Sequence, residues 1–370
     1  MRFAEKSKPN VLERHGMDQL RRWNRRSASA IHALDATESA TLRRLERGTL
    51  IGAAVAGALS GAILGGAEVI WSGRMGNLAR DMSREQWQYW AFYLVLVVIV
   101  SGLEILFLYW NAIRGAGNIS SLAGLQLSRE GTGDAVARAL VRAALELPNL
   151  RERVYWVDPY ARTSRWKLTL LAVGYKLKVG ATSFLLRILL RRIVGRAAVR
   201  FFIPLVAIPV YAIWNTVVTG WVLRQARIRA FGPLAIRELA DHVTARRDQL
   251  RPDCRRLIAQ GVGEAIVRTG TAHPNYHLLL GRLVEVLQLS PQEVNVEWDS
   301  VRDTARQLTP EEQQTFLTVL TVAVIIDGSV RKAEAALLEE AHQLCQRPLD
   351  WQKINQMRTA FLDGQGIRGG

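Results

Sequence analysis

Few residues of the types that perform chemistry stand at spacings that would let them act together. His273 and His277 are four positions apart, a spacing that could present two imidazole rings to one metal ion. Pro274 begins a helix between them and no third ligand accompanies them, so we favour a capping or surface role. Cys254 and Cys345 are too few for a disulfide scaffold or a cysteine-based zinc site, and we expect both thiols to be inert.

The sequence motifs of common catalytic sites are missing. The chain has no G-x-x-x-x-G-K-[ST], no G-x-S-x-G and no H-E-x-x-H. We therefore expect neither an enzyme nor a bound cofactor. The function has to be inferred from the way in which apolar, basic and polar residues are distributed along the chain.

The net charge of +16 on 370 residues comes mostly from one stretch. Positions 159–237 contain fourteen Lys and Arg residues and no acidic residue, and they are also rich in Leu, Ile, Val, Phe and Trp. Basic and apolar side chains together favour the surface of an anionic membrane leaflet over nucleic acid, which binds basic residues on polar folds. The predicted lipid-surface residues are Lys176, Lys178, Arg187, Arg191, Arg192, Arg196 and Arg200.

Two segments are predicted to cross a membrane. Residues 50–71 and 90–113 are each long and apolar enough for a hydrocarbon core of about 30 Å. Aromatic residues stand at both ends of the second segment, as expected at the two membrane interfaces. The Lys and Arg residues before the first segment and after the second predict that both termini lie in the cytoplasm.

The first segment carries small residues at every fourth position, and the second carries one acid near its middle. Ala53, Gly57, Gly61 and Gly65 share one helical face, which lets another backbone approach closely. This face could form a dimer interface or pack against the second segment of the same chain. Glu104 could serve in a proton or ion relay, but we favour an interhelical hydrogen bond because it is the single acid at that depth.

Residues 166–231 permit two interpretations. Residues 201–223 contain no charge and could span, but a single crossing would place the arginines that follow them outside, against the charge rule. We favour a basic amphipathic helix followed by a re-entrant or shallow hairpin broken near Pro204 and Pro209, because a proline inside a helix costs about 3 kcal/mol. The alternative is two further spans. Asn215 is the polar residue inside this apolar stretch.

Residues 200–231, RFFIPLVAIPVYAIWNTVVTGWVLRQARIRAF, resemble the membrane-associated hairpin of EcsC-type bacterial proteins. The shared features are a basic approach, a proline-containing apolar helix, and Asn215, Thr219 and Ala226 along a second helix. The resemblance implies a partner at a bacterial inner membrane rather than an enzyme.

The chain as a whole is predicted to be all-α. We expect a helical N-terminal region (1–49), a membrane hairpin (50–113), a linker with short helices (114–165), a basic membrane-inserted region (166–231) and a helical-bundle C-terminal domain (232–370). Asp35 and Glu38 fit a capping box before the first membrane segment, and Thr309 and Glu312 fit another in the C-terminal domain.

Two boundaries of these regions follow from composition. Residues 115–133 are rich in Gly and Ser and are expected to form a loop. The dipeptide Gly232-Pro233 is expected to begin the C-terminal domain, where both charge signs alternate on amphipathic helices.

An apolar helix in the C-terminal domain ends at Asp327-Gly328, and Glu334 follows seven positions after the Asp in the next helix. This pattern resembles the TerB-like domain of tellurite-resistance and DjlA-type co-chaperone proteins, over about residues 275–362. The resemblance implies that the corresponding acids, Asp327 and Glu334, could form a metal-binding or interaction patch. We favour a structural turn, in which Gly328 supplies a positive φ angle and a neighbouring side chain caps the helix end.

These features predict a non-catalytic adaptor anchored in the membrane, which presents its C-terminal domain to a protein partner in the cytoplasm or to a second copy. Roles in envelope stress, or beside a transport or GTPase system, fit the two resemblances. The alternative is a small oligomeric channel or transporter subunit that uses Glu104 and the face formed by Gly57, Gly61 and Gly65.

Overall fold

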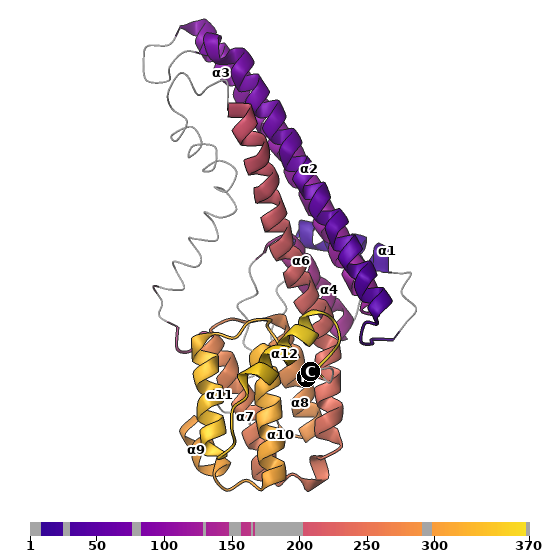
Figure 1. The fold of residues 1–370 in the computed structure, drawn as a ribbon, viewed down its shortest axis with the longest axis vertical. Coiled ribbons are helices and arrows are strands. Elements are labelled where there is room, and N and C mark those ends of the chain that lie inside the picture. Colours follow the sequence, from indigo (N-terminus) through magenta and orange to yellow (C-terminus); the bar gives the residue numbers. More distant parts are fainter. Residues whose placement is uncertain are drawn as a thin grey trace. The chain divides into compact units, whose positions relative to one another are not determined.

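The computed structural model describes residues 9–24, 30–75, 83–128, 131–147, 157–163, 166, 203–290 and 298–367. All regular elements within these ranges are helices, and the predicted all-α fold class is confirmed for this part of the chain. Figure 1 labels the helices along the sequence. Their bounds are α1 Val11–Asn24, α2 Ala36–Met75, α3 Arg84–Leu122, α4 Gly131–Ala144, α6 Ile203–Thr244, η2 Arg247–Gln249, α7 Pro252–Thr269, α8 Pro274–Leu287, α9 Trp298–Ala305, α10 Pro310–Ile325, α11 Lys332–Leu344 and α12 Trp351–Leu362.

The chain divides into two compact units that do not follow the predicted domain order. Unit 1 consists of Met1–Leu42, Ala116–Ser164 and Gln225–Gly370, and unit 2 of Arg43–Gly115 and Arg165–Arg224. The N-terminal region, the linker and the C-terminal domain, which we expected as separate parts, therefore belong largely to one unit. Packing between distant segments produces this grouping, and composition along the chain does not reveal it.

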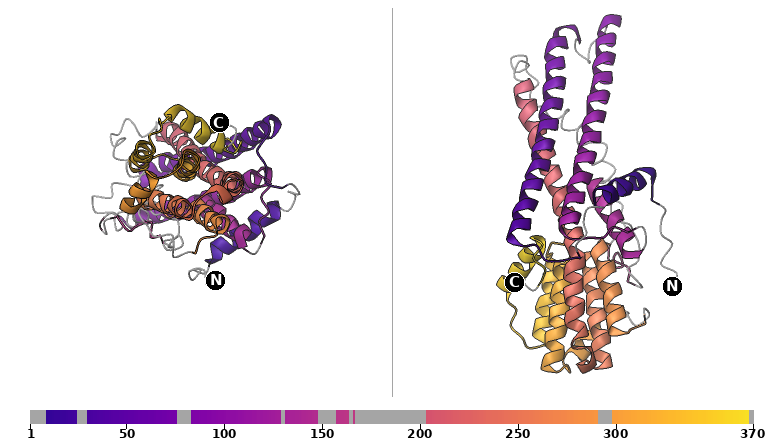
Figure 2. Two further views of the ribbon diagram at one scale, coloured as in Figure 1. Left: turned by 90° about the horizontal axis from the view of Figure 1, so that it is seen from below. Right: turned by 90° about the vertical axis from the view of Figure 1, so that its right-hand side faces the viewer.

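Unit 1 is a helical bundle with an ordinary apolar core, in which several helices run side by side (Figure 2). Phe316 of α10 is fully buried, and its ring lies so close to Gly261 of α7 that a Cβ added there would come within 2.8 Å of Cε2. At the N-terminal end, the buried carboxylate of Glu13 accepts a hydrogen bond from Arg142, which ties α1 to α4. The Leu34 N–H also donates to the Gly364 carbonyl oxygen at 2.8 Å, so polar contacts link the first segment of unit 1 to both the second and the third.

Helices α2 and α3 are each long and apolar enough to cross a membrane, α2 over Ala36–Trp71 and α3 over its whole length. Asp35 and Glu38 form the predicted capping box at the start of α2: the Glu38 N–H donates to Asp35 Oδ1 at 2.7 Å, and the Asp35 N–H donates to Glu38 Oε2 at 3.0 Å. The cap satisfies the first backbone donors, which a helix cannot satisfy internally.

Helix α3 continues through residues that we predicted as a loop. It ends at Leu122, and α4 begins at Gly131, so much of the Gly/Ser-rich stretch 115–133 is helical. The reason is burial: Ala116 and Ile119 are 0% and 1% exposed. Packing of that apolar face outweighs the low helix propensity of the neighbouring glycines.

Helix α6 corrects the predicted hairpin, because it runs without a break from Ile203 to Thr244. Pro204 lies in the first turn, where a helix needs no N–H donor. Pro209 removes one backbone hydrogen bond but does not end the helix, since apolar helices tolerate proline when packed against neighbours. The predicted break near these two prolines is therefore wrong.

The same helix also passes through Gly232-Pro233, which we expected to be a domain boundary. Asn275 of α8 lies against this point: its Nδ2 donates to the carbonyl oxygens of Ile228 and Ile326, both at 2.9 Å. A Cβ added to Gly232 would lie 2.5 Å from the Asn275 side-chain amide. One buried amide from another helix thus supports the backbone where the proline weakens it.

Candidate functional site

The small residues of α2 lie against α6 of the same chain. A Cβ added to Gly57 would lie 2.5 Å from the Tyr211 carbonyl oxygen, and one added to Gly61 would lie 3.0 Å from Ile208 Cα. Ala53 and Gly65, the other members of the stripe, are buried as well. The face that we assigned either to a dimer or to the second span is thus covered by a third helix, which neither alternative included.

Glu104 and Asn215, which the sequence analysis singled out separately, meet inside unit 2. Asn215 Nδ2 of α6 donates to Glu104 Oε1 of α3 at 2.7 Å, and the two residues are only 6% and 8% exposed. A carboxylate that accepts a charge-assisted hydrogen bond inside a helix bundle holds the helices together. The contact joins residues 111 positions apart in the sequence.

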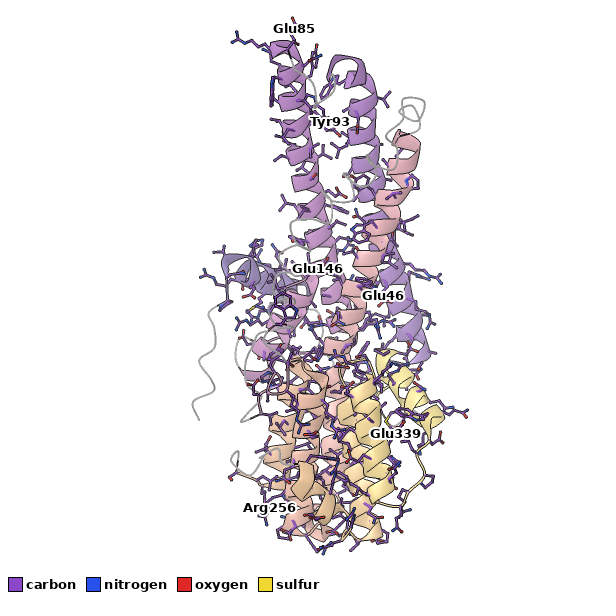
Figure 3. The ribbon with its side chains drawn as sticks, turned by 90° about the vertical axis from the view of Figure 1, so that its left-hand side faces the viewer. Glu46, Glu85, Tyr93, Glu146, Arg256 and Glu339 are labelled. Carbon is purple, nitrogen blue, oxygen red and sulfur yellow. The ribbon has the colours of Figure 1, made fainter. Side chains whose placement is uncertain are left out.

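Two further polar contacts of unit 2 were not predicted from the sequence. Asn111 Nδ2 of α3 donates to the Thr49 carbonyl oxygen of α2 at 2.8 Å. Tyr93 of α3, which Figure 3 labels, donates through its hydroxyl to Glu68 Oε2 of α2 at 3.3 Å. The sequence contains one indication of such contacts, which is the presence of polar residues within long apolar segments. A buried polar group needs a hydrogen-bond partner.

The outward face of unit 2 is apolar on all three helices. Ile51, Val55, Leu59 and Ile63 of α2 are 48–63% exposed, and they recur at every fourth position. The exposed apolar residues of α6 are Ile213, Val217 and Trp221, at the same spacing, and those of α3 include Phe92, Leu94, Val95, Val98, Ile99, Leu103 and Leu106. Four residues are just over one helical turn, so the sets of α2 and α6 each form a continuous stripe.

The contacts of α6 also set its direction. Gly57 lies by Tyr211 and Gly61 by Ile208, so residue numbers rise along α2 as they fall along α6. Helix α6 is therefore antiparallel to α2. Its first residues stand at the end of unit 2 where α2 finishes and α3 begins, and Figure 1 shows the three helices running together.

In unit 1, the Asp327-Gly328 turn is structural. Gly328 has φ = 82°, and Asp327 Oδ1 accepts hydrogen bonds at 2.9 Å from the Ser329 backbone N–H and hydroxyl. A Cβ added to Gly328 would lie 2.4 Å from Ile228 Cδ1 of α6, so glycine is required here both by conformation and by space. The turn that we favoured over a metal site is present.

Glu334, the second acid of this pattern, is fully buried with protein donors on both carboxylate oxygens. Oε1 accepts from the Thr269 hydroxyl and, at 3.2 Å, from the Tyr276 hydroxyl, and Oε2 accepts from the Arg331 N–H at 2.8 Å. Burial raises the pKa of Glu334, and it also raises the pKa of Tyr276 well above its usual range. Among the described residues, no group of three His, Cys, Asp or Glu residues could hold a metal ion.

The remaining candidates also have structural roles. The capping role of His273 is confirmed, since its side chain accepts from the Asn275 backbone N–H at the start of α8. Burial lowers the pKa of His273 well below its usual range and that of His277 to about 4, so both imidazoles are neutral at pH 7. Burial raises the thiol pKa of Cys254 to about 12 and that of Cys345 to about 11, which keeps both thiols protonated.

No protein-family model, curated protein or solved structure matches this chain.

The seven basic residues that we expected at the lipid surface lie outside the described residues. They are Lys176, Lys178, Arg187, Arg191, Arg192, Arg196 and Arg200. Within unit 2, the polar residues Glu104, Asn111 and Asn215 are buried between the helices, and large apolar residues of all three helices are exposed.

Proposed function

We propose that this chain is a non-catalytic membrane anchor that presents a helical interaction unit at one face of the bilayer. The observation that carries the proposal is the inverted polarity of unit 2. Glu104, Asn111 and Asn215 are buried between its helices, while rows of Val, Leu, Ile and Phe face outward. In water such a surface is costly, and in lipid it is the expected one.

In the described part of the chain the anchor contains three crossing helices, α2, α3 and α6, which fits the alternative of two further spans within residues 166–231. The part of α6 that belongs to unit 2, Ile203–Arg224, is about 33 Å long at 1.5 Å per residue, enough for a hydrocarbon core of about 30 Å. Helices in a membrane associate through small residues that let backbones approach closely and through interhelical hydrogen bonds. Helix α6 has both, a glycine-lined contact with α2 and a hydrogen bond with α3.

Three of the four connections between the units leave the same end of unit 2. These connections follow Leu42, Gly115 and Arg224. The surplus of basic residues near them supports placing that end, the bulk of unit 1 and both termini in the cytoplasm of a bacterial cell.

Unit 1 supplies the adaptor surface in this proposal. Its TerB-like turn, with Asp327 and Glu334 occupied by internal hydrogen bonds, supports a rigid scaffold for a protein partner, in envelope stress or beside a transport or GTPase system. The channel alternative used Glu104 and the glycine face. Both are in contact with α6 of the same chain, which supports the adaptor over a pore.

A pair of charge substitutions tests the anchor. Val98→Lys/Leu103→Lys places two charges on the outward face of α3, where both residues are more than 60% exposed. In lipid each lysine costs about 2.5–3.5 kcal/mol, so we expect a large loss of protein from the carbonate-resistant membrane fraction. Val11→Lys/Leu12→Lys is the matched control in α1 of unit 1, with side chains 72% and 62% exposed, and should leave the fractionation unchanged.

Two outcomes would contradict the anchor. One is a wild-type chain that carbonate releases from membranes. The other is a double-lysine variant of α3 that stays in the membrane fraction as fully as the control. Cross-linking in intact cells tests the adaptor role, and recovery of lipid with no protein partner would count against it.

A further inference from the structure

Resting on the membrane anchor proposed above, we infer that one end of unit 2 carries a ring of arginines that binds the phosphate groups of anionic phospholipids. The three helices of unit 2 come into close contact near this end. A Cβ added to Gly115 of α3 would lie 2.8 Å from Leu223 Cδ2 of α6 and 3.3 Å from Thr49 Cγ2 of α2. Contacts this short place Thr49, Gly115 and Leu223 at one level of the unit.

Each of the three helices has an exposed arginine within two residues of that level. These are Arg47 of α2, Arg114 of α3 and Arg224 of α6, and Arg43 and Arg44 add two more one turn earlier in α2. We call these five residues the arginine collar. Glu46, labelled in Figure 3, lies among them, so the collar keeps a clear positive surplus.

Tryptophans lie just inside the collar, toward the apolar stretch. Trp110 is 46% exposed and Trp221 is 61% exposed, each about one turn from the collar arginine of its own helix. The Arg114 guanidinium stands 5.5 Å from the centroid of the Trp110 ring, a cation–π contact. Exposed tryptophan beside arginine is the composition of a membrane interface at headgroup level.

The neighbouring residues decide which phosphate the collar meets. Beyond the tryptophans, exposed apolar side chains lie about one turn from the collar in α2, at Ile51, and about two turns from it in α3 and α6, at Phe107 and Val217. A ligand that contacts the arginines while acyl chains cover those residues is a phospholipid. A guanidinium offers five donors in a planar fork that matches phosphate, so arginine suits this contact better than lysine.

The other end of unit 2 differs in charge. The first residues of α3 there are Arg84 and Glu85, adjacent, both exposed and of opposite sign. The first residues of α3 at this end thus carry no net charge, whereas the end from which the chain continues into unit 1 carries the surplus of the collar. An anionic leaflet would meet that end preferentially and orient the anchor.

The test measures which lipids the full-length protein retains. The chain is reconstituted in nanodiscs of equal parts phosphatidylglycerol and phosphatidylcholine, and native mass spectrometry gives the ratio of the two lipids that stay bound. We expect the wild type to retain mainly phosphatidylglycerol. The variant Arg47→Gln/Arg114→Gln/Arg224→Gln should lower the ratio by about fivefold for each arginine replaced, and added salt should weaken the wild-type preference.

A matched control distinguishes the loss of the collar from the loss of three positive charges anywhere in the chain. Arg256→Gln/Arg282→Gln/Arg306→Gln removes three exposed arginines from unit 1, where each pairs with an acid of its own helix or the adjoining turn. This variant should retain the wild-type ratio. Far-ultraviolet circular dichroism of both triple variants checks that the helices are intact.

Three results would overturn the inference. They are an equal ratio for the wild type and the collar variant, an equal loss in the control variant, and displacement of phosphatidylglycerol by millimolar inorganic phosphate, which would make the collar a site for free phosphate. A wild-type chain found outside the nanodiscs would instead contradict the membrane anchor itself.

Discussion

The two units of this chain are both helical, but they differ in which side chains they expose. In unit 1, Phe316 and Leu239 are fully buried and charged side chains cover the surface. In unit 2, Glu104 and Asn215 are buried, and Phe92 is 66% exposed. Apart from Val11 and Leu12, every exposed large apolar side chain among the described residues lies in unit 2.

This difference teaches that the units are stabilised by different forces. Unit 1 is stabilised because folding removes apolar surface area from water. In the proposed anchor unit 2 lies in lipid, which is as apolar as leucine, so it would gain no stability in this way and would depend on close backbone approach and interhelical hydrogen bonds. The glycine contacts of α2 with α6 and the pair Glu104–Asn215 supply both.

The largest expected effect on stability comes from replacing a buried phenylalanine of unit 1 by alanine, compared with the same replacement of an exposed phenylalanine in unit 2. Phe316→Ala removes a fully buried ring from between α10 and α7, and should lower the free energy of unfolding by about 3–5 kcal/mol. Phe92→Ala removes an exposed ring from unit 2 and should change the free energy of unfolding in micelles by about 0.5 kcal/mol or less. Denaturant titration in mixed micelles measures both, and equal losses would remove the distinction between the units.

A glycine substitution sharpens the comparison within unit 2. Gly57→Leu places a side chain where Cβ alone would lie 2.5 Å from the Tyr211 carbonyl oxygen, so α6 has to move away. We expect a loss of about 1–3 kcal/mol, as for overpacked cores. Gly102→Leu in α3 is the control, since nothing lies within 4 Å of its added Cβ. If both variants unfold at the same denaturant concentration, α6 does not cover this face.

The smallest expected effect concerns the buried polar pair. Glu104→Gln keeps an acceptor for Asn215 Nδ2 and should be nearly neutral, whereas Glu104→Leu removes it. A double-mutant cycle with Asn215→Leu should give a coupling energy of about 0.6 kcal/mol, and no more than about 1.7 kcal/mol. Zero coupling would mean that the hydrogen bond contributes nothing, and ion flux lost in Glu104→Gln would favour the channel.

The features that the sequence predicted well are local. The capping boxes of Asp35 with Glu38 and Thr309 with Glu312 both form, because the residues that make each cap are three positions apart. Two helices long and apolar enough to cross a membrane follow from composition alone. The positive φ angle of Gly328 follows from a glycine at a helix end.

The features that the sequence could not predict depend on distant partners. Pro209 and Gly232-Pro233 predicted breaks, but α6 continues because other helices pack against it, with Asn275 supporting the second point. The helix that packs against the small residues of α2 could not be predicted for the same reason. The four-residue spacing identifies a close-packed face but does not show which helix covers it. The sequence also offered Glu334 as a possible metal ligand, because the hydrogen bond that it accepts from the distant Tyr276 is not visible in the sequence.

The contact between Glu104 and Asn215 has a consequence for biosynthesis. Their separation of 111 residues corresponds to about 6–20 s at a synthesis rate of about 5–20 residues per second. During that interval α2 and α3 have already been made, while their carboxylate and glycine face wait for α6. In the proposed anchor, the pace of the ribosome would therefore decide how long the unfinished bundle remains open to insertion factors or to a second nascent copy.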